Sequence, residues 1–413
     1  MPRRRAAPRY IVRARLEGSA KSAPIDVSDR VLRLQYEDVE KGTDKLSIEV
    51  DNDKFQNLSN PIFAQGTILE FSYGYADGVM SPFRTAIITK VTGGGKLKIE
   101  AKGQVYLLDT EKKIRKFENV KRSDVAKKIA EEHGFASTDV QVIEDTEVIH
   151  GAILQTKLTD AQFLRDLANK EGFEFRIAGG KFYFRSRDLK QPPIREWVYF
   201  IDPNEGDIIT EPNIENDITA KPGTITAKGI DPKTKKVIEK KADNTTTKGR
   251  PGLADFVGIN SKSGQREPRI KRTAQSAVVS TTEKSQKGAE RNVVGAYKQI
   301  QLTAIKLTFT NIGDPGVSAT DIVSIKGIDA ASGRYYLTKV VHTLQKEYQM
   351  GISCSSDGKS KPDSPTAVKS QASIAKATAA GNKGGVNSNT KLTPVKVVDA
   401  RSGATRTVFR PPR

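Results

Sequence analysis

A glycine-rich run and a Glu-Glu-His run are the first places to look for chemistry. Thr92-Gly-Gly-Gly-Lys-Leu-Lys-Ile-Glu100 has the glycines and lysines of a phosphate-binding loop but lacks the spaced Gly-Lys-Ser/Thr signature. No helix is expected after it to aim N–H groups at a phosphate, so a hairpin turn is the better interpretation. Glu131-Glu132-His133 differs from the HExxH motif of zinc peptidases. We interpret it as a helix end, where the helix dipole favours a cation.

Metal ligands are too few and too scattered to predict a metal centre. The sequence holds three histidines and one cysteine, Cys354, and His150 and His342 stand alone in strand-like segments. Zinc sites need clustered Cys and His ligands, so we predict no metal site. A single cysteine also excludes an internal disulfide framework and suits synthesis in a reducing cytoplasm.

Neighbouring carboxylates are the remaining candidates for acid–base chemistry. A glycosidase needs two carboxylates that face each other across a sugar. Glu171 with Glu174, and Glu144 with Asp145, lie in patterns that predict solvated loops and strand faces. The sequence also contains no Gly-x-Ser-x-Gly nucleophile elbow. We therefore predict no enzymatic activity and no bound cofactor.

Positive charge is the strongest feature of the composition. The 413 residues carry a net charge of +19. Residues 361–413 hold ten Lys and Arg against Asp363 and Asp399, which gives +8, and six arginines lie in the first fifteen residues. Such basic ends bind nucleic acid, anionic surfaces or acidic proteins. A nucleic-acid-binding protein is therefore one interpretation, although no aromatic stacking platform or basic recognition helix is evident.

No segment predicts insertion into a membrane. No apolar run approaches the roughly 18 residues needed to span a bilayer. The N-terminus is basic and lacks the apolar region of a secretory signal. We expect no membrane span.

The clearest local structure lies between residues 156 and 184. Thr159 and Gln162 form a capping box, so a helix should begin there, and Gly172 should end it. Alternating apolar residues and a turn at Gly179-Gly180 then predict a hairpin. A shorter helix is expected from Ser123. These elements predict an α/β module at about 113–190, between two regions of short antiparallel strands typical of a barrel or sandwich.

A series of segments between about residues 10 and 356 follows a known family pattern in order. They are Ile48–Asn52, Gly66–Tyr75, Thr159–Phe175, Thr224–Thr234, Gly313–Pro315, Asp321–Gly327, Ser332–His342 and Tyr348–Ile352. Together they resemble the phage late control D, or tail-baseplate hub, family, which includes the hub half of VgrG-like proteins. One departure is Ala319-Thr320, which stands where a Pro-Gly or similar turn is expected before the next strand.

The resemblance implies a mainly β fold with an α/β insertion: two tube-like antiparallel β-barrel domains plus a small helix–hairpin module. We place the first barrel at residues 1–112, completed by strands at about 195–235, and the module at 113–190. The second barrel is placed at 191–357, with a long loop at 240–280 and a helix at 283–297. Both barrels are expected to share one topology, because three chains would present six equivalent positions to a sixfold tube.

The implied function is that of a structural baseplate hub in a contractile tail or injection machine. Hubs of this family are trimeric rings that adapt the sixfold tail tube to the threefold central spike. The expected partners are two further copies (a homotrimer), the tail tube protein, a separate central spike protein and neighbouring baseplate proteins, with the tape measure protein as a further candidate. The expected location is the virion tail baseplate, or an equivalent injection particle, after assembly in the bacterial cytoplasm. A tail-tip cell-wall hydrolase built on this scaffold is a second alternative, which would need an additional catalytic domain.

Residues 358–413 are predicted to be a basic, flexible tail outside the family pattern, and no fused spike domain is expected. Its first part has few large apolar residues to offset the cost of ordering the backbone. Val395–Phe409 has enough Val and Thr for a strand or a hairpin around Arg401-Ser402-Gly403. The candidate partner-binding residues, expected to face acidic groups of the spike or a baseplate protein, are Arg401, Arg406, Arg410 and Arg413.

Overall fold

The computed structural model describes most of the chain in separate ranges. These are residues 7–16, 23–187, 189, 191–199, 207–215, 224–230, 234–243, 256–259, 266–270, 276–280, 286–303, 305–328, 331–356, 393–398 and 405–410. The chain divides into two compact units, Met1–Asp363 and Ser364–Arg413. The fold is mainly β with antiparallel sheets, as the sequence predicts.

The first half of the larger unit is an antiparallel sheet of short strands. They are β1 (Pro8–Arg15), β2 (Ile25–Asp26), β3 (Val31–Val39), β4 (Lys45–Asp51), β5 (Ile68–Tyr75), β6 (Arg84–Gly93) and β7 (Lys96–Gly103). Their order is β3-β4-β7-β6-β5-β1, with β2 at the edge. Alternate side chains such as Leu46, Ile48 and Val50 are buried, which is the period-two pattern of a strand with one face in the core. The glycine-rich run at 92–95 forms the β6–β7 hairpin turn, as predicted.

The second half begins with two strands from a segment that the sequence assigns to the second barrel and also to the completion of the first. Its strands are β13 (Arg195–Val198), β14 (Asn213–Glu215), β20 (Ile305–Ile312), β21 (Ile322–Lys326), β22 (Gly333–Leu344) and β23 (Tyr348–Ser356). β13 pairs with β21 and β14 with β20, so both belong to the second half rather than completing the first. The Trp197 ring of β13 packs edge-on against Phe309 of β20, with centroids 5.9 Å apart. This apolar contact fixes β13 there.

The two halves repeat one strand order. In chain order, β1, β3, β4, β5, β6 and β7 correspond to β13, β14, β20, β21, β22 and β23. If the six strands of each half are numbered along the chain, their order across the sheet is 2-3-6-5-4-1 in both halves. Each neighbouring pair is antiparallel, except that β13 runs parallel to β21 where β1 runs antiparallel to β5. The expected common topology is therefore confirmed in strand order and wrong for the direction of one strand.

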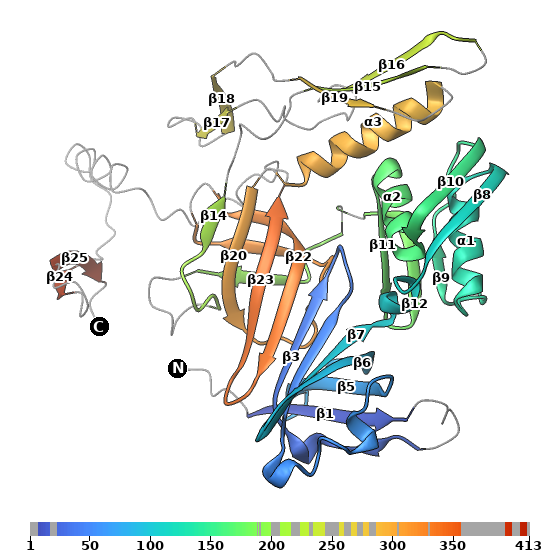
Figure 1. Cartoon of the computed structure of the whole chain (residues 1–413). Helices are drawn as coiled ribbons and strands as arrows, with labels where there is room; N and C mark the ends of the chain where they lie inside the picture. Colours follow the sequence, from blue (N-terminus) through green and yellow to red (C-terminus); the bar gives the residue numbers. More distant parts are fainter. Residues whose placement is uncertain are drawn as a thin grey trace, which may run out of the picture. The chain divides into compact units, whose positions relative to one another are not determined.

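A single strand pairing joins the halves into one sheet (Figure 1). β3 of the first half pairs with the C-terminal part of β22, from Val39 opposite Lys339 to Leu34 opposite Leu344. The strands of the two halves then form one 13-stranded sheet. One apolar core runs through both halves, from Phe71 and Tyr73 to Tyr348 and Met350. The two β regions are thus packed as one body.

The repeat explains the departure at Ala319-Thr320. The N–H of Gly66 donates to β6 at 2.9 Å, and the N–H of Thr320 donates to the matching position of β22 at 2.8 Å. Both residues have left-handed backbone, with φ +88° at Gly66 and +78° at Thr320. Glycine takes this conformation at little cost, whereas a β-branched residue is strained. Arg176 donates to the Thr320 hydroxyl at 2.6 Å and to the Ala319 carbonyl at 2.7 Å, which holds the strained turn.

Replacing Thr320 with glycine should leave the free energy of unfolding within about 1 kcal/mol of that of the unchanged chain. Relief of about 1–3 kcal/mol of backbone strain offsets the loss of one hydrogen bond from the charged Arg176, worth about 1.5–3 kcal/mol. Denaturant unfolding measures the change. Thr338→Gly is the matched control and should destabilise the protein, because Thr338 has no positive φ and its hydroxyl donates to Ser353 at 3.0 Å. A larger loss of stability in T320G would mean that the bond to Arg176 outweighs the strain.

The predicted α/β module is present between the two halves in sequence. It contains β8 (Lys112–Val120), α1 (Arg122–Glu132), β9 (Gln141–Ile143), β10 (His150–Thr159), α2 (Asp160–Glu171), β11 (Phe173–Ala178) and β12 (Lys181–Ser186). The capping box is confirmed: Thr159 Oγ1 accepts from the Gln162 N–H at 3.2 Å. Gly172 ends α2 with φ +75°. The helices pack on the hairpin through their own apolar core, which includes Phe163, Leu167, Phe182 and Phe184.

A further module lies within the second region. β15 (Thr224–Ile230), β16 (Val237–Ala242) and β19 (Ser276–Ser280) form a sheet that lies alongside α3 (Gln286–Gln301) in Figure 1 and shares an apolar cluster with it. The segment predicted as a loop at 240–280 also contains β17 (Phe256–Ile259) and β18 (Arg266–Ile270). β15 pairs with β19 in parallel across a long sequence separation. Local composition does not reveal such a pairing, and the polar, glycine-punctuated sequence suggests a loop.

Two glycines let α3 cross the end of α2 at backbone contact. A Cβ on Gly295 would lie 2.7 Å from the Gly172 nitrogen and 2.7 Å from the Lys170 carbonyl oxygen. A glycine inside a helix weakens it by roughly 1 kcal/mol relative to alanine. Gly295 is therefore explained by packing, because any side chain would separate the helices.

The smaller unit contains the predicted hairpin. β24 (Thr393–Val398) and β25 (Thr405–Arg410) pair antiparallel, with Val395 opposite Val408, on either side of the Arg401-Ser402-Gly403 segment. Of the predicted flexible tail at 358–413, residues 358–392, 399–404 and 411–413 lie outside the described residues.

Candidate functional site

The β3–β4 turn, residues 39–44, is where the parts of the larger unit meet. The Glu40 N–H donates to a carbonyl of β22 at 3.0 Å, and its carboxylate accepts from Arg187, just after β12, at 2.6 Å. The Gly42 carbonyl accepts from Arg165 of α2 at 2.9 Å. One short turn of the first half thus contacts the second half and the α/β module.

A set of charged and aromatic residues beneath this turn forms what we call the ionic joint: Tyr36, Asp38, Asp44, Arg84 and Arg176. Arg84 of β6 donates to the Tyr36 hydroxyl at 3.3 Å and lies 3.8 Å from the Asp38 carboxylate. It also donates to Ser318 Oγ, in the second half, at 2.8 Å. The Asp38 carboxylate accepts in addition from the Ala319 N–H at 3.2 Å. Asp38 and Arg84 therefore tie the first half to the turn before β21.

Asp44 completes the joint with a shifted pKa. Its carboxylate accepts from the Tyr36 hydroxyl at 2.9 Å and from the Val39 N–H at 3.1 Å. Burial, and then the negative charge of Asp38, raise the pKa of Asp44 to about 7. Asp44 therefore changes charge near neutral pH, and the joint becomes more negative above it.

His342 of β22 is a packing residue in the joint's aromatic wall. Its ring stacks on Tyr36 at 6.2 Å and lies 4.5 Å from Tyr73, and its Nδ1 is 2.7 Å from the Tyr348 hydroxyl. Burial, and then the charge of Arg84, lower the pKa of His342 to about 3. The imidazole is therefore neutral and fills space between strands of the two halves.

His133 lies in a second polar cluster, inside the α/β module. It caps the end of α1, as predicted, and its Nε2 is 2.9 Å from the Asp160 carboxylate. Asp160, the first residue of α2, also accepts from Lys113 at 2.7 Å, Gln155 at 2.9 Å, and Arg115. Burial acts to raise the pKa of Asp160, but hydrogen bonds from His133, Lys113 and Gln155 outweigh it and lower the pKa. The cluster fastens two strands and two helices together.

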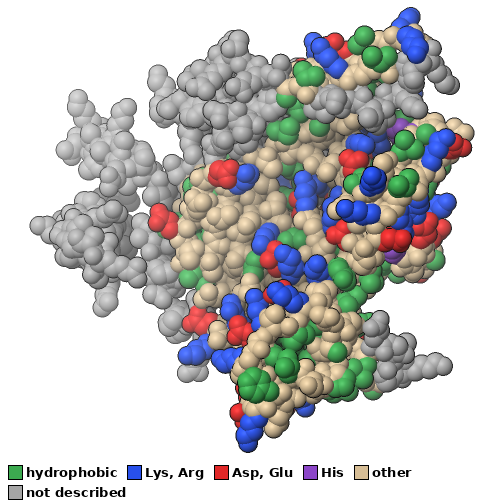
Figure 2. Space-filling view, in the orientation of Figure 1, with side chains coloured by type: hydrophobic (Ala, Val, Ile, Leu, Met, Phe, Trp, Pro, Cys, Tyr) green, Lys and Arg blue, Asp and Glu red, His purple; other side chains and the backbone are tan. Residues whose placement is uncertain are grey.

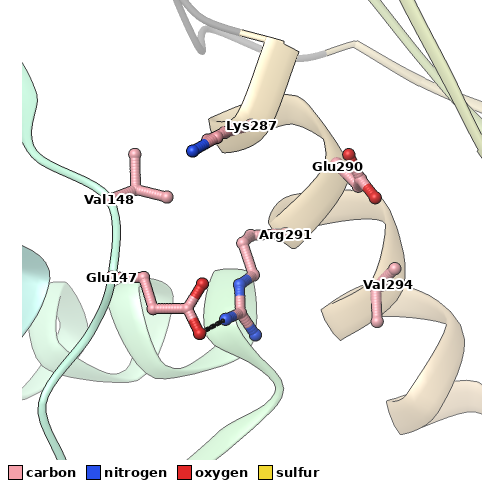
Figure 3. Close-up of a pocket in the computed structure, with 6 residues that line it drawn as sticks. All are labelled: Glu147, Val148, Lys287, Glu290, Arg291 and Val294. Carbon is pink, nitrogen blue, oxygen red and sulfur yellow. Dashed lines mark ion pairs between the residues drawn. The ribbon is translucent and has the colours of Figure 1, made fainter.

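A pocket of about 320 Å³ lies between the α/β module and α3. Figure 3 shows its lining, which consists of Glu147, Val148, Lys287, Glu290, Arg291 and Val294. Arg291 of α3 forms a 2.6 Å ion pair with Glu147, whose side chain is 77% exposed. The dashed line in Figure 3 marks this pair, which bridges the two sides of the pocket. The pocket lies where the two modules pack together, and Glu290 of its lining pairs with Lys240 outside it, at 3.6 Å.

The predicted partner-binding arginines all belong to the smaller unit. Arg406 and Arg410 lie on β25, while Arg401 and Arg413 lie outside the described residues. Cys354 is buried in β23. In the described ranges, no three His, Cys, Asp or Glu side chains are grouped to hold a metal ion. No helix among the described residues is long and apolar enough to cross a membrane.

On the face shown in Figure 2, the described residues carry charges of both signs. In Figure 2, Lys and Arg side chains are interspersed with Asp and Glu over the described part of that face. Pairs such as Lys121–Asp145, at 2.7 Å, and Arg15–Glu70, at 2.6 Å, place opposite charges together. The described part of this face lacks the single-sign stripe typical of a nucleic-acid groove.

Most of the chain matches a known protein family. Residues 17–346 match the family described as the Alg8 N-terminal domain. The chain belongs to this family. No curated protein matches the sequence of this Alg8 N-terminal domain protein.

Two solved tail proteins share its fold. The tail protein from Neisseria meningitidis MC58 has a TM-score of 0.59 at 15% identity, covering 86% of this chain and 98% of that chain. The 43 kDa tail protein of prophage MuSo2 from Shewanella oneidensis has a TM-score of 0.56 at 11% identity, covering 84% and 98%. At these identities the likeness concerns the fold alone.

Proposed function

We propose that the protein is a structural hub of a phage tail baseplate or a related injection particle. Three copies close into a ring that adapts the sixfold tail tube to the threefold central spike. The observation that carries the proposal is the repeated strand order of the two sheet halves. Two equivalent halves in each of three chains give six equivalent positions around one axis.

The described residues suit such a role. The charges of the ionic joint bind one another across the two halves, which fixes the orientation of the halves instead of presenting reactive groups. The fold shared with two tail proteins supports a place in a tail. The proposed partners are further copies, the tail tube protein, a separate spike protein and neighbouring baseplate proteins. The proposed location is the tail baseplate.

The basic C-terminal unit is proposed as a partner-binding segment. Its β24–β25 hairpin offers strand edges for main-chain pairing with another protein. Arg401, Arg406, Arg410 and Arg413 would face acidic groups of the spike or of a neighbouring baseplate protein.

The mass of the purified particle tests the hub. Light scattering should give three times the 45.2 kDa chain mass, independent of concentration across the measured range. A chain ending at residue 363 should remain trimeric but capture less spike protein. A full-length chain that stays monomeric at high concentration would contradict the hub.

A further inference from the structure

Strands β6 and β22 hold the same place in the repeated order and share local detail. Each has a register shift against its neighbour, at Thr89 in β6 and at Thr338 in β22. At both shifts the threonine hydroxyl donates across the ladder, to Glu100 at 3.2 Å and to Ser353 at 3.0 Å. The sequences around them are Ile-Thr-Lys-Val and Leu-Thr-Lys-Val. The two strands can therefore be matched residue by residue, with Lys90 equivalent to Lys339.

Strands β3 and β14 match in the same way. Glu37 of β3 lies opposite Lys45, and Glu215 of β14 lies opposite Lys306. One residue earlier, Tyr36 lies opposite Leu46 and Ile214 lies opposite Leu307. Glu37 is therefore equivalent to Glu215, and Tyr36 to Ile214.

The equivalent strands differ in whether a second strand pairs with the same edge. β22 pairs with β21 through residues 333–336 and then with β3 through residues 339–344. β6 pairs with β5 through residues 84–87, and no described strand pairs with the same edge at Lys90–Gly93. Among the described strands, β14 has a neighbour only on its β20 side. The β3–β22 pairing, which we call the filled pairing, therefore has an equivalent, β14 with β6, that is not formed within the chain.

Side-chain exposure follows the same difference. Tyr36, on the paired strand β3, is 3% exposed, whereas its equivalent Ile214 on β14 is 45% exposed. Across the filled pairing, Lys339 forms a 2.8 Å ion pair with Glu37. Its equivalent Lys90 is exposed at the free edge of β6. Unpaired strand edges invite pairing with another chain.

We infer that β14 of one copy pairs antiparallel with the free edge of β6 of the next copy, in the register of the β3–β22 pairing. Thr92 of the next copy then lies opposite Glu215 of the first, Gly93 lies opposite Ile214, and Lys90 of the next copy forms an ion pair with Glu215 of the first. This head-to-tail pairing deepens the proposed hub function and rests on it, because it closes a ring only if the chain forms a closed oligomer.

The filled pairing shows which positions suit a cross-link. The Glu40 N–H donates to the Thr338 carbonyl, so alternate pairs such as Asp38 with Val340 are hydrogen-bonded, and Glu37 with Val341 is not. Non-hydrogen-bonded pairs bring Cα atoms to about 4.5 Å and side chains close, which suits a disulfide. The equivalent pair between copies is Thr92 with Glu215.

The test is the double variant T92C/E215C in the full chain, oxidised and run on a denaturing gel without reductant. We expect covalent dimers and trimers, which reductant removes. The matched control is E37C/V341C at the filled pairing, which should cross-link within one chain and leave its mass unchanged. The single variants T92C and E215C should give no covalent trimers, because the native Cys354 is buried and cannot serve as the second cysteine.

A second variant keeps the test independent of cysteine chemistry. Val91 corresponds to Val340, whose N–H faces β3, so the Val91 N–H faces the free edge of β6. V91P should leave a folded chain of monomer mass, because it removes one donor of the pairing between copies. A trimer of the unchanged chain without cross-linking in T92C/E215C, or a trimeric V91P, overturns this pairing and leaves the hub standing. A monomeric unchanged chain overturns both.

Discussion

Replacing Arg84 with methionine should lower the free energy of unfolding by about 3–5 kcal/mol at pH 8, the cost of breaking a buried ion pair from one side. Arg84 is 13% exposed and Asp38 1% exposed in their 3.8 Å pair. Without the guanidinium, the Asp38 carboxylate stays buried near Asp44 with one cation fewer. The loss should weaken the contact between the two sheet halves and, with it, any assembly that depends on their orientation.

The effect of Arg84→Met should be smaller at pH 5. The pKa of Asp44 is about 7 in the folded protein, above its ordinary value of 3.8. Protonation therefore favours the folded state, and the stability that this group contributes is complete below about pH 4 and is lost as the pH rises through 7. At pH 5 Asp44 is neutral, so the methionine variant leaves one buried charge instead of two.

Denaturant unfolding at pH 5 and pH 8 measures both effects. Trp197, the single tryptophan, is buried in the shared core and reports on the sheet by its fluorescence. R84K is the matched control and should lose less, because lysine keeps the charge but not the planar fork. The free energy of unfolding of R84M/D44N should be nearly the same at pH 5 and pH 8. A loss below about 1 kcal/mol at pH 8 would mean that the joint adds little to stability.

Local signals in the sequence predicted the elements that local interactions decide. The capping box at Thr159 and the αL glycine at Gly172 act within one turn, and α2 begins and ends where they place it. The hairpin β11–β12 follows from Gly179-Gly180 in the same way. The strands of the first half follow from their period of two. These features need no knowledge of distant parts of the chain.

The ionic joint could not be predicted, because its members are far apart in sequence. Asp38, Arg84 and Arg176 come from three different strands, β3, β6 and β11. Sequence gives no sign that these charges are buried. The sequence Thr-Lys-Val occurs at both Thr89 and Thr338. A match of three residues occurs too often by chance to predict a structural repeat.

Replacing Arg122 with methionine should destabilise the α/β module by about 3–5 kcal/mol. Arg122 begins α1 and Glu171 ends α2, and their side chains form a 2.6 Å ion pair with exposures of 2% and 3%. Removing one partner leaves Glu171 as a buried charge without this cation. Hydrogen exchange of α1 and α2 should rise accordingly, while the unfolding of the sheet reported by Trp197 should change less.

The double variant R122M/E171L separates the worth of the pair from the cost of breaking it. Because burying two ions is itself expensive, apolar residues of similar volume should recover most of the lost stability, within about 1 kcal/mol of the unchanged chain. The ion pair would then serve to fix which end of α1 meets which end of α2, and so to position the Gly172–Gly295 contact with α3. If R122M/E171L is as unstable as R122M, the pair stabilises the module directly. If R122M alone is unchanged, the module does not depend on it.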